Sequence, residues 1–161
     1  MLIRHVKPED AEDIRTIYNH YVLNTDISFE TEEVSLAEMT DRIREISSVY
    51  PYFVCEDEGH VKGYCYAHPW KARRAYEHTL EISIYLTPGM TNAGIGTKLL
   101  ERVLEETRGI DVHSLIACIT ATNKASISFF TAHGFRKVSY FKEVGYKSGR
   151  WLDVTDLELI L

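Results

Sequence analysis

The sequence has few cysteines and no pattern of metal-binding residues. Its three cysteines, Cys55, Cys65 and Cys118, lie far apart and form no CxxC pair, which argues against a disulfide framework or a zinc site. Each lies in an apolar, strand-like run, so we expect three buried thiols. The seven histidines form no HxxxH or HExxH pair. We therefore predict no metal site.

An excess of positive charge and long apolar runs are also missing. Lysine and arginine total 18 against 24 aspartates and glutamates, a net charge of −6, and this argues against a nucleic-acid-binding protein. No apolar run approaches the roughly 18 residues that span a bilayer. The N-terminal stretch MLIRHVKPEDAEDI contains charged residues too early to form the apolar core of a signal peptide. We expect a cytoplasmic protein with no nucleic-acid or membrane partner.

What the chain does contain is typical of one globular enzyme or binding domain. Its 161 residues are 45% hydrophobic and 26% charged, without repeats, low-complexity segments or linkers. We predict a single domain over residues 1–161.

The first third of the chain predicts one strand and two helices. Leu2–Lys7 alternates like a short strand, and Pro8 then opens a helix. Ser35 followed by Glu38 fits a capping box for a second helix that ends near Ile46. The apolar face of the first helix consists of Ala11, Ile14, Tyr18 and Tyr21.

The middle of the chain predicts three strands and one helix. Two strands are expected in Tyr52–Ala67, joined by a tight Glu58-Gly59 turn. Leu80–Leu86 is the third strand and leads through a glycine-rich turn into a helix that ends at Gly109. The apolar stripe of that helix consists of Ile95, Leu99, Leu100, Val103 and Leu104.

The last third predicts a strand, a helix and two more strands. Ser114–Ala121 reads as a buried strand, and Asn123 caps a following helix that Gly134 ends. Phe135–Leu161 fits two long strands around a GYKSGRW turn. The order β-α-α-β-β-β-α-β-α-β-β predicts an α/β fold of the α+β type, a mixed sheet with helices on both faces.

The glycine-rich turn matches neither of two common phosphate-binding motifs. Gly89 and Gly94 have the spacing of a mononucleotide P-loop, but Ile95 stands where the lysine is required. Leu99 replaces the third glycine of the dinucleotide fingerprint. The remaining motif, Gly94-Ile-Gly-Thr97, opens a helix whose amides can bind a pyrophosphate. The same turn is also typical of a plain tight connection.

The element order, this GxG turn and the motif NKAS…GF (Asn123–Ser126, then Gly134-Phe135) resemble the GNAT superfamily of N-acetyltransferases. Three longer blocks resemble its phosphinothricin and methionine sulfoximine N-acetyltransferase family. These blocks are NHYVLNTDISFETE (Asn19–Glu32), HPWKARRAYEHTLEISIYLTP (His68–Pro88) and YKSGRWLDVTDLEL (Tyr146–Leu159). The resemblance implies one GNAT domain with a splayed central sheet flanked by helices, and a homodimer.

The resemblance also implies acetyl-CoA as co-substrate, without a metal. In the family the glycine loop holds the pyrophosphate. The residues that match cofactor-binding positions are Ile84, Tyr85, Leu86, Thr91, Asn92, Ala93, Gly94, Ile95, Gly96, Thr97, Asn123, Ser126 and Phe130.

Glu81 is the candidate catalytic residue. Five strand steps, about 16 Å, separate it from Leu86, so a pantetheine arm paired with this strand would bring the thioester near Glu81. We expect Glu81 to take the proton of the attacking amine, directly or through one water, and an amide at or near Leu86 to stabilise the oxyanion. The family's catalytic glutamate occupies the matching position. A solvated or salt-bridged strand glutamate is the structural alternative.

Two residues depart from the family pattern. Thr91 replaces the usual glutamine or arginine of the loop, which removes one charge-assisted phosphate contact. Phe130 stands where many members have a tyrosine and the phosphinothricin enzymes a histidine, so it cannot protonate the departing sulfur. Either the sulfur leaves as thiolate or another group, such as Tyr140 or Tyr85, supplies the proton.

The WKARR stretch supplies the candidate substrate residues. Lys71, Arg73 and Arg74 fit a carboxylate or a tetrahedral oxyanion, and Phe29 and Tyr76 are candidates for the pocket wall. A solvated basic loop, or one that contacts the 3′-phosphate of CoA, explains the same charges.

We therefore expect an N-acetyltransferase for a small amino acid or analogue of the phosphinothricin, methionine sulfoximine or methionine sulfone type. Two alternatives stay open: acetylation of protein N-termini or other amines, and a non-catalytic acetyl-CoA-binding domain.

Overall fold

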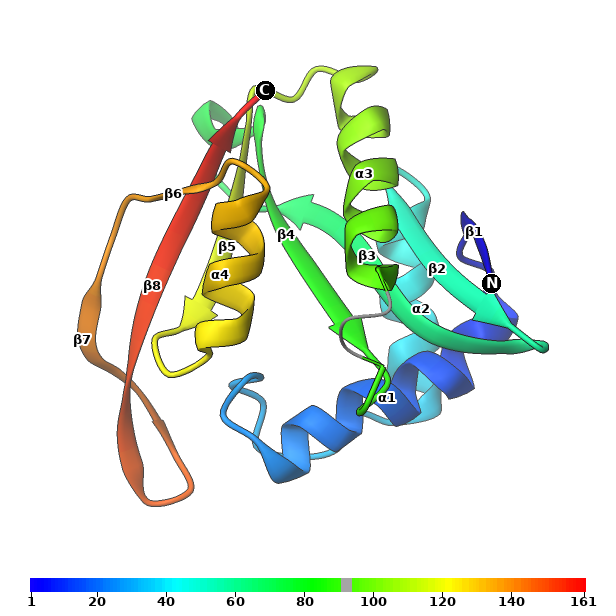
Figure 1. The fold of residues 1–161 in the computed structure, drawn as a ribbon, viewed down its shortest axis with the longest axis horizontal. Coiled ribbons are helices and arrows are strands. Elements are labelled where there is room, and N and C mark those ends of the chain that lie inside the picture. The colour runs from blue at the N-terminus through cyan, green and yellow to red at the C-terminus, as the bar shows by residue number, and fades with distance from the viewer. Residues whose placement is uncertain (91–93) are drawn as a thin grey trace. The chain divides into compact units, whose positions relative to one another are not determined.

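The computed structural model describes residues 1–90 and 94–161, which form two units (Figure 1). The fourth strand, β4 (Thr79–Leu86), contributes residues to both units. Unit 1 consists of Met1–His20, Glu33–His68 and the described part of Ser83–Asp111, and unit 2 of Tyr21–Glu32, Pro69–Ile82 and Val112–Leu161.

The sheet of unit 1 has the strand order β1-β2-β3-β4. Both β1 (Leu2–His5) and β3 (His60–Pro69) are antiparallel to β2 (Tyr52–Asp57). Between β2 and β3, Glu58 and Gly59 both have positive φ, 51° and 80°, the turn that matches the twist of a hairpin. The predicted Glu58-Gly59 turn is confirmed.

Three helices belong wholly or mainly to unit 1. They are α1 (Ala11–Asn24), α2 (Leu36–Ser47) and α3 (Ile95–Arg108). Figure 1 shows α3 on the viewer's side of β2 and β3, with α2 behind them. The Ser35 hydroxyl accepts a hydrogen bond from the Glu38 amide at 3.1 Å, which confirms Ser35 as the N-cap, while the Glu38 carboxylate pairs with Arg42. The predicted apolar stripe of α3 is buried.

The predicted start of the first helix needs a small correction. Pro8 opens a 3₁₀ turn, η1 (Pro8–Asp10), and the α-helix begins after it at Ala11. The Asp10 carboxylate accepts a hydrogen bond from the Lys7 amide at 2.8 Å. This contact favours the tight first turn.

The sheet of unit 2 combines parallel and antiparallel pairing. β4 runs parallel to β5 (Ser114–Thr120), and β8 (Arg150–Ile160) is antiparallel to β5. The predicted α/β class with a mixed sheet is confirmed. A helix, α4 (Lys124–Ala132), contacts β5 and β8, and a short 3₁₀ turn, η2 (Arg74–Tyr76), precedes β4.

The two predicted strands around the GYKSGRW turn are confirmed, but Phe135–Leu161 also contains a third, short strand that was not predicted. Three strands form there, because β6 (Arg136–Lys137) and β7 (Phe141–Lys147) pair separately with β8. Between them, Ser139 bonds to β8 through its carbonyl oxygen, at 2.8 Å from Thr155 Oγ1, and through its hydroxyl, at 2.9 Å from the Asp156 amide. These contacts interrupt the regular ladder and divide the expected strand.

The expectation of three buried thiols is wrong. Cys55 and Cys65 are buried, whereas Cys118 is exposed although it lies in the middle of β5. The apolar sequence of the strand does not reveal this exposure.

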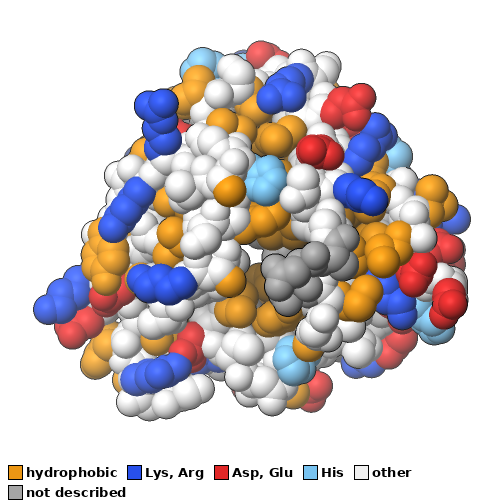
Figure 2. All heavy atoms as spheres, in the orientation of Figure 1, with side chains coloured by type: hydrophobic (Ala, Val, Ile, Leu, Met, Phe, Trp, Pro, Cys, Tyr) orange, Lys and Arg blue, Asp and Glu red, His pale blue; other side chains and the backbone are white. Residues whose placement is uncertain are grey.

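The surface shows mixed charge on the face drawn in Figure 2. Acidic and basic side chains occur together there rather than in one basic patch. Within residues 1–90 and 94–161, no helix has the length and apolar character needed to cross a membrane.

Candidate functional site

The predicted base Glu81 lies on β4 within unit 2. It stands opposite Ile116 of β5, and it is half-buried while its neighbours Leu80 and Ile82 are 1% and 3% exposed. The predicted alternation is therefore present around Glu81. Its carboxylate belongs to the more open face of the strand.

Three side chains that the sequence did not indicate surround the face that carries Glu81. Cys118 stands opposite Asp156 of β8 in the register of the two strands. Although Cys118 is exposed at the surface, its neighbours partly desolvate the thiol and raise its pKa; the charge of Glu81 and a hydrogen bond with Asp156 raise it further, while a hydrogen bond with Trp70 lowers it. The thiol is consequently neutral at physiological pH, and Glu81, Asp156 and Trp70 are all its neighbours.

Trp70 connects this face to two of the predicted substrate residues. The Lys71 ammonium lies 4.1 Å from the centre of the Trp70 ring and 5.2 Å from that of Tyr76. The two rings meet edge to face at 5.4 Å. Trp70 is also held from β4, because its amide donates to the carbonyl oxygen of Thr79 at 3.3 Å. Trp70 thus contacts Lys71 and Tyr76 on one side and Cys118 on the other, and the charge of Glu81 acts on the Cys118 thiol.

The predicted group of three cations is not gathered at one point. Arg73 precedes η2 and is exposed. Arg74 is 92% exposed in its side chain, and its Nε lies 3.9 Å from the Glu77 carboxylate. Only Lys71 packs on the aromatic rings, so the roles of Arg73 and Arg74 in substrate binding stay predictions.

Phe29, the other predicted wall residue, contacts the strand β7. A Cβ atom added to Gly145 would lie 2.4 Å from Cε2 of the Phe29 ring. The ring therefore covers the Gly145 backbone, and the side chain remains 42% exposed.

The predicted pyrophosphate site begins at the N-terminus of α3 in unit 1. Gly94 precedes the helix with a positive φ of 73° and provides no capping side chain. The Lys98 amide donates to the Gly94 carbonyl at 3.2 Å, and the amides before it have no acceptor within an α-helix. The first turn of α3 carries no acidic residue. The predicted loop residues Thr91, Asn92 and Ala93 lie outside the described residues.

The half of β4 in unit 1 carries the predicted pantetheine residues Ile84, Tyr85 and Leu86. The Tyr85 ring stacks on Tyr64 at 5.4 Å. Gly63 of β3 was not predicted to matter, but a Cβ atom there would lie 2.5 Å from Leu86 Cδ2. Glycine at 63 therefore lets β3 approach the Leu86 side of β4 closely.

The three predicted cofactor residues on or next to α4 have defined structural contacts. Asn123 accepts from the Ser126 amide at 3.2 Å and donates to the Ser126 hydroxyl at 2.9 Å, so the predicted cap is confirmed. Phe130 is 3% exposed and packs against Phe135. Their contacts with acetyl-CoA stay predictions.

Tyr140, one suggested proton donor, is already engaged. Its hydroxyl donates to the carboxylate of Asp153. That hydrogen bond is the main reason why the pKa of Tyr140 is raised. Tyr140 is therefore a weaker acid than a free tyrosine.

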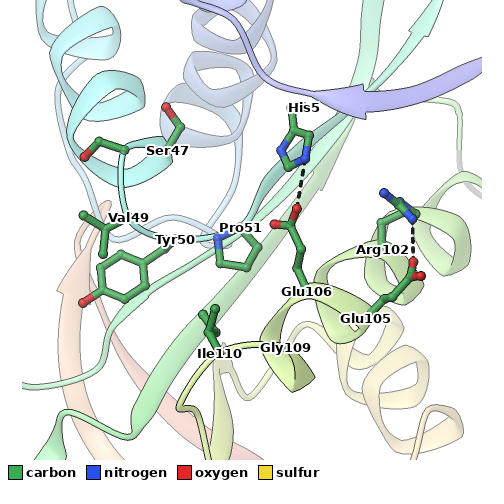
Figure 3. A pocket seen from close by; sticks show the side chains of 11 residues that line it. His5, Ser47, Val49, Tyr50, Pro51, Arg102, Glu105, Glu106, Gly109 and Ile110 are labelled. Carbon is green, nitrogen blue, oxygen red and sulfur yellow. Dashed lines mark hydrogen bonds and ion pairs between the residues drawn. The ribbon is translucent and has the colours of Figure 1, made fainter.

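One cavity of unit 1 has a volume of about 520 Å³ and lies at the C-terminal ends of α2 and α3 (Figure 3). Two side-chain contacts lie in its wall: His5 Nε2 is 2.9 Å from the Glu106 carboxylate, and Arg102 pairs with Glu105 of the same helix at 2.5 Å. None of the predicted site residues lines it. Its lining consists of His5, Ser47, Ser48, Val49, Tyr50, Pro51, Arg102, Glu105, Glu106, Gly109 and Ile110.

Comparison with known proteins identifies the family. The family model described as the acetyltransferase (GNAT) domain matches residues 3–155. An L-amino acid N-acyltransferase of Escherichia coli is 35% identical over 100% of this chain and 94% of its own length. A phosphinothricin N-acetyltransferase of Streptomyces viridochromogenes is 33% identical over 92% of this chain and 83% of its own length. The chain belongs to the GNAT acetyltransferase family and is an N-acetyltransferase.

Solved structures agree with this assignment and confirm the predicted GNAT fold. A ribosomal-protein-alanine N-acetyltransferase from Brucella melitensis superimposes with a TM-score of 0.96 at 36% identity and covers 100% of both chains. A GNAT phosphinothricin acetyltransferase from Sinorhizobium meliloti, solved in complex with acetyl-CoA, gives a TM-score of 0.95 at 36% identity and covers 99% of this chain and 88% of its own. The predicted resemblance to the phosphinothricin enzymes is confirmed.

Proposed function

We propose that this enzyme transfers the acetyl group of acetyl-CoA to the amino group of a small amino acid or analogue. The names of the relatives support this acceptor class, since they include an L-amino acid N-acyltransferase and a phosphinothricin N-acetyltransferase. The acetyl-CoA complex of a structural neighbour supports the donor. The observation that carries the proposal is the position of Glu81 on the more open face of β4, within electrostatic range of Cys118, whose neighbour Trp70 packs against the Lys71 ammonium.

In this proposal Glu81 is the general base. An amine is mostly protonated at neutral pH and attacks only in its neutral form, so Glu81 takes one proton from the ammonium, directly or through one water. The amine nitrogen then bonds to the thioester carbon, and a backbone amide of β4 donates to the oxyanion. Cys118, held neutral, adds no second negative charge beside Glu81.

The sulfur of coenzyme A leaves as a thiolate when the carbon–sulfur bond breaks. Phe130 cannot donate a proton, and the Tyr140 hydroxyl is committed to Asp153, so Tyr85 of β4 stays the alternative donor. A thiol with a pKa near 8.5 is a good enough leaving group to depart without an acid. The nitrogen still carries one proton too many after the attack and releases it to solvent as the intermediate collapses, and the departed thiolate takes a proton from solvent.

The donor site in this proposal begins at α3. The free amides of its first turn, and the dipole of the helix behind them, bind the pyrophosphate. The pantetheine arm pairs with β4 from Leu86 toward Glu81 as an added strand would.

The acceptor site in this proposal uses Lys71, Tyr76 and Phe29. The Lys71 ammonium attracts the acceptor carboxylate, while Trp70 and Tyr76 hold the lysine by cation–π contacts. Phe29 provides an apolar wall for the acceptor side chain.

The substitution Glu81→Gln tests the mechanism. We expect kcat to fall by about 10²-fold to 10⁴-fold, with acetyl-CoA affinity nearly unchanged, because the amide keeps the shape and loses the base. Release of the CoA thiol is followed with L-phosphinothricin and L-methionine sulfoximine, and acetyl-CoA binding by calorimetry. Glu45→Gln, at an exposed position of α2, is the control. Unchanged turnover in Glu81→Gln would remove Glu81 from the mechanism.

A second acceptor class has one observation in its favour. The Brucella melitensis neighbour is named as a ribosomal-protein-alanine N-acetyltransferase. Adding a peptide with N-terminal alanine to the acceptor panel separates the two classes, since a preference for the peptide would transfer the proposal to protein N-termini. Acetyl-CoA binding without thiol release by any amine would instead indicate a sensing domain.

A further inference from the structure

The hairpin that joins β7 to β8 has no part in the reaction above, yet it holds the loop of residues 25–32. Lys147 at the end of β7 is only 6% exposed. Its ammonium donates to the carbonyl oxygens of Thr25 at 2.9 Å and Ser28 at 2.6 Å. Burial lowers the pKa of Lys147, and the charge of Glu30 opposes this shift. The buried Lys147 ammonium thus binds two main-chain oxygens of one loop.

Two more contacts fix the same part of the loop. Arg150, opposite Lys147 in the hairpin register, forms an ion pair with Asp26, whose side chain is 12% exposed. The hydroxyl of Thr120 on β5 donates to the Asp26 carbonyl at 2.7 Å. The carbonyl oxygens of Thr25, Asp26 and Ser28 therefore all accept hydrogen bonds from side chains of the sheet.

Gly145 determines the position of the Phe29 ring, which follows the anchored residues 25–28 in the sequence. Two residues before Lys147, it faces the Phe29 ring so closely that an added Cβ would lie 2.4 Å from Cε2 and 2.7 Å from Cζ. A real side chain at 145 must displace the ring. Because Phe29 is 42% exposed, the ring can rotate outward without a rearrangement of the core.

We propose that Gly145 and Lys147 are positioning residues that determine acceptor specificity by fixing loop 25–32 and the Phe29 ring. This inference rests on the proposed function of Phe29 as a wall of the acceptor pocket. Lys147 holds the loop backbone and Gly145 provides the space for the ring. A displaced ring changes which acceptor side chains fit, while the donor site and the base remain as they are.

The first experiment compares Gly145→Ala with Gly109→Ala. An added Cβ at Gly109 meets only the Glu106 carbonyl oxygen at 3.4 Å, an ordinary contact. We expect Gly145→Ala to raise the KM for L-phosphinothricin by about tenfold to a hundredfold and to change its rate relative to L-methionine sulfoximine. The KM for acetyl-CoA stays within about twofold, as do all parameters of Gly109→Ala.

The second experiment compares Lys147→Met with Lys142→Met, which removes an exposed lysine of the same strand. Hydrogen exchange of the amides in 25–32 is measured by mass spectrometry. We expect exchange at least about tenfold faster in Lys147→Met alone, accompanied by a raised acceptor KM. Unchanged exchange in 25–32 would overturn the anchoring role of Lys147.

Phe29→Ala separates failure of the inference from failure of the proposed function. If Phe29→Ala leaves the acceptor KM unchanged, the proposed wall role of Phe29 is wrong. If it raises the KM but Gly145→Ala does not, the inference alone is wrong. We expect both single variants to raise the KM and the double variant to add nothing to Phe29→Ala, because the new methyl group then has no ring to displace.

Discussion

Two cations with little solvent exposure, Arg4 in unit 1 and Lys147 in unit 2, differ in the groups that accept their hydrogen bonds. Arg4 donates mainly to carboxylates: both terminal nitrogens bond Asp10 at 2.8 Å, its Nε bonds Glu56 at 2.7 Å, and one terminal nitrogen also reaches the His5 carbonyl at 3.0 Å. Lys147 donates to main-chain carbonyl oxygens at 2.6 and 2.9 Å. The first arrangement neutralises charge, and the second holds a segment of backbone.

The difference has consequences for stability and for function. Removal of Arg4 leaves a carboxylate in a nearly buried position, since the Asp10 side chain is 9% exposed, and such a charge is costly. Removal of Lys147 takes the shared donor from two neutral carbonyl oxygens, that of the half-buried Thr25 and that of the buried Ser28, and leaves no uncompensated charge. We therefore expect Arg4 to govern folding and Lys147 to govern loop position.

The largest expected effect tests the unit 1 side of this comparison. Arg4→Met should lower the free energy of unfolding by about 3 kcal/mol, because the Asp10 carboxylate loses its partner. Urea unfolding at pH 7 measures the change. Arg74→Met, which alters a side chain that is 92% exposed, should stay within about 0.5 kcal/mol. Equal effects of the two variants would show that the Arg4 contacts contribute nothing beyond a surface pair.

A smaller effect is expected from pH, because the stabilisation that comes from the ionised Asp10 carboxylate depends on its protonation. Burial raises the pKa of Asp10, but the hydrogen bonds from Arg4 and from the Lys7 amide outweigh burial and lower it below its usual value. The folded protein thus holds this proton more weakly than the unfolded chain. The stabilising contribution of Asp10 is complete above the pKa of aspartate in the unfolded chain, near 3.9. It is lost as the pH falls through the lower pKa of Asp10 in the folded protein.

Urea unfolding between pH 2.5 and 7 measures this loss. Asp10→Asn should show a shallower decrease of stability in the acid range than the wild type, because the variant has no carboxyl at position 10 to protonate. Lys147→Met should keep the slope of the wild type. A slope in Asp10→Asn as steep as in the wild type would contradict the assignment to Asp10.

The smallest effect on overall stability is expected in unit 2. Lys147→Met should lower the free energy of unfolding by only about 1 kcal/mol, although it frees loop 25–32. The same urea titration at pH 7 gives this value. A loss as large as that of Arg4→Met would mean that Lys147 supports the fold as a whole, and the comparison would then fail.

The features that were predicted best are those that depend on residues close together in the sequence. The Ser35 and Asn123 caps and the Glu58-Gly59 turn depend on contacts over a few residues, and all three are confirmed. Gly134, with φ of 89°, follows the end of α4 as expected. Such signals are readable because the side chain and the backbone group that it affects are close in the chain.

The sequence failed where distant segments decide. The exposure of Cys118 depends on what covers the middle of β5, and the split of the last strands depends on the bonds of Ser139 to β8. Trp70 and Asp156 also escaped prediction as neighbours of Cys118. Trp70 lay within a motif that already indicated the family, so its position before Lys71 was a signal that could have been used.

The turn at the tip of the β7–β8 hairpin also bears on how a new acceptor specificity is engineered. Ser148 and Gly149 both adopt positive φ, 53° and 77°, and the two-residue turn fixes Lys147 directly opposite Arg150. An insertion at this turn would shift the register and detach both cations from loop 25–32. Libraries aimed at other acceptors should therefore vary residues 29–32 and leave the hairpin and the anchored residues 25–28 intact. The hairpin then serves as a fixed frame within which the acceptor wall can be redesigned.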